Sequence, residues 1–386
     1  MKKLLFFIFS FGLANFSIPL YSYQYIFNFN KSDNPDSIGL HDFVFFKDIY
    51  ENDSILLANG PGVSSSGGSG SGGSGSDGSG SSSSGSGGSG SSSSGSGGSG
   101  SSSSGSGGQN LRNSNLNKAN LKKANFKNSD LSGSKFKEAD LKQANLSGAK
   151  LKNTDFTKAK LKKANLKNAN LKNAKLIRAD LSDAELNNAE LENANLRNSK
   201  LKKAKLKDAK LKRANLTNAK LKKADLTNAS LIKAKLRRAD LTKANLKNAV
   251  LEKANLTSAN LRDANLTNAS LNRAKLRKTD LTNAFLTYAS LKKANLTGAT
   301  LTGANLRNTN FFSAVLTRAN LSNADLTEAD LSKSDLSNAN LKNARLKKAN
   351  LSGAILYGLS GTKLVSCPES LPMGWSCNSE NYLLKI

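Results

Sequence analysis

The sequence predicts an all-β solenoid of stacked coils, preceded by an export signal and a flexible linker. Three observations predict this fold class. Leucine recurs at nearly every fifth position over about two thirds of the chain, and a small side chain stands two residues before nearly all of these positions. Only 37% of the 386 residues are hydrophobic and 6% are aromatic, which is too little for a conventional large core.

Residues 1–22 are typical of a secretory signal peptide. Lys2 and Lys3 precede an apolar run, as in the charged and hydrophobic parts of such signals. Cleavage after Ala14 and cleavage near Ser22 both fit the pattern. We therefore expect export to the periplasm, the cell envelope or the extracellular space. The alternative is an uncleaved membrane anchor, although the apolar run barely reaches the length that spans a bilayer.

Two further segments separate the signal from the repeats. Residues 23–63 are short, acidic and rich in aromatic side chains, and about forty residues are marginal for an independent core. Disorder, a small docking motif and a strand that pairs with the solenoid all fit this segment. Residues 64–108 contain only Ser and Gly apart from Asp77, which predicts a disordered, flexible tether.

The repeat occupies residues 109–356 without an insertion. Its small position is Ala in 41 of fifty repeats and Ser or Thr in eight, with Gln109 opening the series. The fifth position is Leu from Leu111 to Leu356 except at four Phe residues. These are Phe126, Phe136, Phe156 and Phe311.

A period of five excludes the two regular structures. An α-helix turns by about 100° per residue, so leucines five apart would form no apolar stripe. A straight strand fails too, because side chains five apart point to opposite faces. Short extended pieces that each end in a corner fit the pattern, because the small residue and the leucine then both point inward. Coils of such pieces, stacked at roughly 4.8 Å, would place leucine on leucine and join their backbones in ladders.

Stretches such as Ala-Asn-Leu-Lys-Asn at residues 164–168 follow the pattern A(N/D)LXX, in which the chain resembles the pentapeptide repeat family. The resemblance implies a right-handed quadrilateral β-helix with four pentads per coil. About twelve coils would then form a rod roughly 60 Å long. Some members of the family are DNA mimics that bind type II topoisomerases through an acidic surface, and this chain has the opposite charge.

The positive charge of the chain belongs to the repeats. The whole chain carries +29, and residues 109–362 hold 51 Lys or Arg against 19 Asp or Glu. Such a field favours an anionic polymer or envelope surface as partner, and it also keeps rods soluble. Export disfavours nucleic acid as the partner.

Nine lysines would form one vertical basic stripe if four pentads make a coil, because their numbers differ by about twenty. Ser182 and Asp183 interrupt it. The stripe consists of Lys122, Lys123, Lys142, Lys162, Lys163, Lys202, Lys203, Lys222 and Lys223. The alternative is that these side chains are simply solvated and screened by salt.

Residues 357–386 are expected to cap the last coil, with Trp375 as an apolar lid. Cys367 and Cys377 are the only cysteines of the chain, and in an exported protein they favour a disulfide. A zinc site is disfavoured because four ligands are the norm. The other end of the stack shows no comparable lid, so pairing there with residues 23–63 or with a second copy, end to end, is an open expectation.

The repeats contain neither His nor Cys, so no catalytic site, cofactor, metal or small-molecule substrate is expected. The sequence favours a non-catalytic binding or scaffold rod with a basic surface for anionic partners. The alternative is a structural spacer or adhesion rod without a specific ligand.

Overall fold

The computed structural model describes strand β1 (Tyr23–Ile26), strand β2 (Val44–Lys47), and residues 108–359 and 361–386. The expected signal peptide and nearly all of the expected linker lie outside these residues. Strands β1 and β2 pair with each other in a two-stranded sheet. Nothing in the described residues forms a helix, so none of them provides a helical membrane span.

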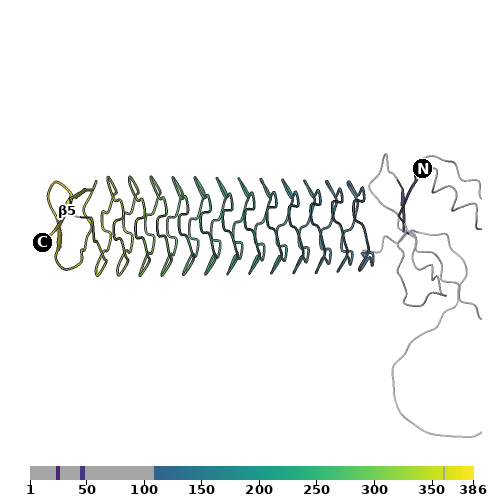
Figure 1. Ribbon diagram of the computed structural model, residues 1–386, viewed down its shortest axis with the longest axis horizontal. Coiled ribbons are helices and arrows are strands. Elements are labelled where there is room, and N and C mark those ends of the chain that lie inside the picture. Colours follow the sequence, from purple (N-terminus) through teal and green to yellow (C-terminus); the bar gives the residue numbers. More distant parts are fainter. Residues whose placement is uncertain (1–22, 27–43, 48–107, 360) are drawn as a thin grey trace, which may run out of the picture. The chain divides into compact units, whose positions relative to one another are not determined.

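The repeats form a stack of four-sided coils, seen as the ladder in Figure 1. Parallel bridges join residues that are 20 apart, such as Asn110 with Asp130 and Asn245 with Asn265. One coil therefore contains four pentads, as the family resemblance implies, and the fifty pentads make about twelve coils. The predicted all-β fold class is confirmed.

Each pentad contributes to the ladder in the same way, as the pentad around Leu221 illustrates. Its five residues are an inner small residue (Ala219), a bridge residue (Lys220), the central leucine, and two corner residues (Lys222 and Lys223). The backbone N–H of Leu221 donates to the next coil at 2.6 Å, and that of Lys220 donates to the preceding coil at 2.9 Å. Hydrogen bonds to both neighbouring coils thus satisfy the extended part of every interior pentad.

The core is a column of the central and inner side chains. Phe136 stacks on Phe156 with ring centroids 5.0 Å apart and meets the edge of Phe126 at 6.4 Å. Where Ser or Thr replaces Ala, six of the seven buried hydroxyls donate to a backbone carbonyl, as when Thr309 donates to the carbonyl of Leu286 at 2.9 Å. The seventh, Ser129, accepts a hydrogen bond from the backbone N–H of Gln109 at 3.2 Å. Such a bond avoids the cost of a buried unsatisfied hydroxyl, which explains why the inner position tolerates Ser and Thr.

A small antiparallel sheet follows the last coil. It contains β3 (Thr362–Lys363), β4 (Trp375–Cys377) and β5 (Tyr382–Lys385) in the order β3-β5-β4. The backbone ladder continues into this segment, because Asn343 N donates to the carbonyl of Lys363 at 2.9 Å. The segment therefore caps the stack by supplying acceptors to its last coil.

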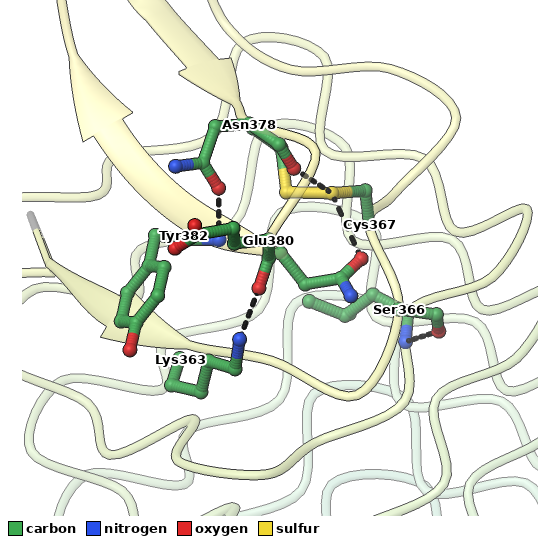
Figure 2. Close-up of a disulfide and its surroundings, with 9 residues drawn as sticks. Lys363, Ser366, Cys367, Asn378, Glu380 and Tyr382 are labelled. Carbon is green, nitrogen blue, oxygen red and sulfur yellow. Dashed lines mark hydrogen bonds between the residues drawn. A yellow bond between two sulfur atoms is a disulfide. The ribbon is translucent and has the colours of Figure 1, made fainter.

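The disulfide between Cys367 and Cys377 joins the segment that follows β3 to the end of β4, with a Cα–Cα distance of 6.0 Å (Figure 2). Trp375 is only half-buried in β4, and the buried apolar side chains are Leu359, Leu364 and Leu383. These three leucines are the buried apolar part of the cap, and whether the Trp375 ring also covers the last coil stays a prediction.

Candidate anion-binding surface

The two corner residues of each pentad sit in a tight turn. In the turn from Leu221 to Ala224, the N–H of Ala224 donates to the carbonyl of Leu221 at 2.9 Å. The second corner residue, Lys223, has φ of +60°, whereas the first, Lys222, does not have a positive φ. This combination is the signature of a type II turn. Both corner side chains therefore point outward from an edge of the coil.

The four turns of a coil define four corners, and each corner repeats every 20 residues along the stack. We number them by their first members: the first corner begins with Arg112 and Asn113, the second with Asn117 and Lys118, the third with Lys122 and Lys123, and the fourth with Lys127 and Asn128.

The net charge of the repeats is concentrated at these corners. Corner positions hold 40 of the 51 basic residues but only 7 of the 19 acidic ones, whereas bridge positions hold 11 basic and 12 acidic residues. Bridge carboxylates stabilise the turn that follows them. The Oδ1 of Asp180 accepts bonds from the backbone N of Ser182 at 3.0 Å and from its hydroxyl at 2.6 Å. The faces are thus nearly neutral, and the four edges carry the positive potential.

All nine lysines of the predicted stripe lie at the third corner and are exposed. Lys122 and Lys142 approach the carboxylate of Asp140, at 3.9 Å and 3.5 Å. Among the described residues, the other seven have no carboxylate oxygen within 4.0 Å. Besides the interruption at Ser182 and Asp183, the structure places Gln143 in the stripe. Whether the stripe binds a ligand stays a prediction.

Two ion-pair networks on the faces were not predicted from the sequence. The carboxylate of Glu185 lies 2.7 Å from the Nζ of Lys167 and 2.8 Å from that of Lys205. Hydrogen bonds from Lys167 and then Lys205 lower the pKa of Glu185 below its ordinary value. The sequence signal is the spacing of 18 and 20 residues between opposite charges, which has meaning only once the coil length is known.

Glu190 repeats the arrangement on the next face. Its carboxylate oxygens lie 2.9 Å from Lys210 and 3.0 Å from Lys172. The hydrogen bond from Lys210, followed by that from Lys172, lowers the pKa of Glu190. These pairs compensate one face lysine and one corner lysine in each network, so the unpaired lysines of the third corner are the stronger candidates for an external anion.

The described residues offer little for catalysis. A hollow of about 400 Å³ is lined by Lys243, Asp263, Phe285 and neighbouring polar residues, without His or Cys. In the part of the chain that the structure describes, no group of three His, Cys, Asp or Glu residues is placed to hold a metal ion.

Two known protein families match the repeats. A family described as pentapeptide repeats matches residues 209–248, 244–283, 279–318, 289–327 and 319–358. A second, described as a pentapeptide repeat region, matches residues 108–176 and 156–221. No curated protein matches the chain.

Three solved structures are similar to this chain. HetL from the cyanobacterium Nostoc sp. strain PCC 7120, a pentapeptide repeat protein involved in the regulation of heterocyst differentiation, is 32% identical. That match covers 64% of this chain and 92% of HetL, with a TM-score of 0.30. Rfr23 from the cyanobacterium Cyanothece 51142 is 26% identical over 30% of this chain and 90% of its own, with a TM-score of 0.22. Trypsin-treated QnrB1, a plasmid-mediated fluoroquinolone resistance protein, is 17% identical over 67% of this chain and 88% of its own, with a TM-score of 0.21.

Proposed function

The chain belongs to the pentapeptide repeat family, and from that premise we propose that it is an exported, non-catalytic rod that binds linear anionic polymers. The polymers would be those of the cell envelope or its surroundings, held along the third corner. Export rests on the charged and apolar start of the sequence. The non-catalytic part of the proposal rests on the family, which is generally non-catalytic.

The observation that carries the proposal is the separation of charge between faces and corners. Lysines at the third corner repeat at roughly the coil spacing of 4.8 Å, and most have no carboxylate partner in the described part of the chain. Neighbouring like charges repel each other, so they hold counterions near the edge. A linear polyanion that lies along the corner would release those counterions, and release makes binding favourable at low salt.

The probe polymer for the binding test is heparin. The protein is recovered from the exported fraction of cells, and its intact mass reports whether residues 1–22 have been removed. We expect retention at physiological salt and an affinity that falls steeply as salt rises. Changing third-corner lysines to Gln should weaken binding more than changing as many lysines of the fourth corner. The test variant carries Lys162, Lys163, Lys202 and Lys203→Gln; the control carries Lys127, Lys207, Lys247 and Lys347→Gln.

Three other outcomes would change the proposal. No retention at physiological salt would contradict the proposal and favour a spacer or adhesion rod that needs only length and solubility. Equal losses in the two variants would mean that total charge, not the third corner, decides binding. Preferential binding to anionic lipid vesicles would replace the polymer by a membrane surface as the partner.

A further inference from the structure

We infer that the stack carries a second polyanion-binding edge on its first corner, so that one molecule holds two polymer chains and cross-links them. This inference rests on the proposed function and extends it from binding to cross-linking. The edge is formed by the second corner residue of five successive coils, which we call the first-corner column: Arg213, Lys233, Lys253, Arg273 and Lys293.

The first-corner column is more continuous than the stripe of nine lysines at the third corner. All five side chains are exposed, and no carboxylate oxygen of the described residues lies within 4.0 Å of them. Asp183 breaks the third-corner stripe in one coil, whereas no acidic residue occupies any of the five positions of the column. Charges stacked at roughly 4.8 Å without internal compensation make a linear site for an anionic chain.

The neighbouring positions of the same corner add to the positive potential. Lys212 and Lys292 stand beside the two ends of the column. Glu252 is the acidic neighbour, and its carboxylate accepts a hydrogen bond from the hydroxyl of Ser270 at 3.2 Å. The corner therefore carries seven basic residues and one acidic residue over five coils.

Backbone conformation shows that folding does not require cations here. The second corner residue is left-handed in every interior pentad of the described coils, with φ of +56° at Lys253, +57° at Lys293 and comparable values elsewhere. Among residues other than Gly, such a conformation favours Asn and Asp, and it is disfavoured for long side chains. The column places Lys or Arg where Asn would fit the turn better.

The fourth corner provides the comparison within the molecule. Its second position has the same conformation, and there Asn recurs, as at Asn228, Asn248 and Asn268. Two of these side chains continue a chain of hydrogen bonds along the stack: the Nδ2 of Asn248 donates to the Oδ1 of Asn228 at 3.0 Å, and the Nδ2 of Asn228 donates to the Oδ1 of Asp208 at 2.9 Å. The same backbone thus carries an amide ladder at one corner and cations at another, which indicates that an external ligand, not the turn, explains the cations.

The first and third corners are half a coil apart, two pentads in each direction. They are therefore opposite edges of a four-sided coil. Both columns reach the same coil, since Arg213 and Lys223 lie in it. A linear polymer along one edge leaves the other edge free, so the arrangement suits two separate chains.

The test compares three variants of the full chain, each lacking four cations. In the first-corner variant, Arg213, Lys233, Lys253 and Arg273 become Asn. In the third-corner variant, Lys123, Lys163, Lys203 and Lys223 become Asn. The control variant is the fourth-corner variant described above, with Lys127, Lys207, Lys247 and Lys347→Gln. Asn suits the left-handed turn, so the first two variants should fold at least as stably as wild type in urea.

Calorimetry at low salt with a heparin oligosaccharide long enough to cover one edge should give two sites for wild type and control, and one for each corner variant. Long heparin should make wild type and control turbid at intermediate ratios, whereas the corner variants should bind it and stay clear. A single site in wild type, or turbidity that persists in both corner variants, would overturn the cross-linking inference and leave the proposed function standing. Absence of any binding by wild type would remove both.

Discussion

Every interior pentad is held by the same set of bonds as its neighbours, whereas the residues of the cap are held by contacts that occur once. In the middle of the stack, the N–H of Leu226 meets the next coil at 2.7 Å, while at the cap the N–H of Leu346 meets the carbonyl of Ser366 at 3.3 Å. The bridge spacing also changes there from 20 to 21 residues, between Arg345 and Ser366. The repeats therefore share their stability among equivalent units, and the cap depends on individual contacts and on its disulfide.

The largest effect is expected inside the stack. Leu226 is fully buried between two coils, so Leu226→Ala should lower the free energy of unfolding by about 2–5 kcal/mol. In a solenoid the lesion also weakens the coupling between the halves on either side. Urea unfolding followed by circular dichroism measures both effects.

Leu116→Ala is the matched control, because Leu116 belongs to the first coil and is 4% exposed. With a neighbouring coil on only one side of it among the described repeats, we expect a smaller loss. Equal losses at the two positions would contradict the picture of stability that is shared between neighbouring coils.

A smaller and more local effect is expected in the cap. Cys367 and Cys377 close a loop of 10 residues, and removing the disulfide by Cys377→Ser should cost about 2–3 kcal/mol. The last coils should then exchange their amide hydrogens first, while the middle of the stack stays protected. If both thiols of the native protein react with an alkylating reagent before reduction, the disulfide is absent and the argument for the cap is wrong.

The smallest effect concerns the ion pairs of Glu185 and Glu190. Their folded pKa lies below the ordinary value of 4.5, so their contribution to stability is present above that pH and is lost as the pH falls through the folded pKa. These carboxylates are partly exposed, at 28% and 26%, and each pair should contribute less than about 1 kcal/mol.

Unfolding measured at about pH 7 and near pH 3 tests this contribution in wild type and in a variant with Glu185→Gln and Glu190→Gln. The difference in stability between the two proteins should be present at neutral pH and shrink at the lower pH. A difference that does not change with pH would show that the pairs contribute no measurable stability.

Most of the candidate site could be predicted from the sequence once a coil length was assumed. The nine lysines stack at one corner because their numbers fit a period of 20. The first-corner column has the same period but was not recognised, because it is a single residue wide and mixes Arg with Lys. The strand register of the cap, which pairs Trp375 with Lys385, could not be predicted, because the cap has no repeat from which to infer it.

The sequence by itself determined the period of five, the inward pair of small residue and leucine, and the positive charge of the repeats. These properties depend on residues a few positions apart, where backbone geometry alone decides which side chains share a side. The tertiary structure decided which residues become neighbours 20 positions apart, that opposite charges pair across the faces, and that cations without a carboxylate partner collect at the corners. The physical reason is that stacking partners are set by the closure of the coil, which involves all four pentads at once and is not encoded in any one of them.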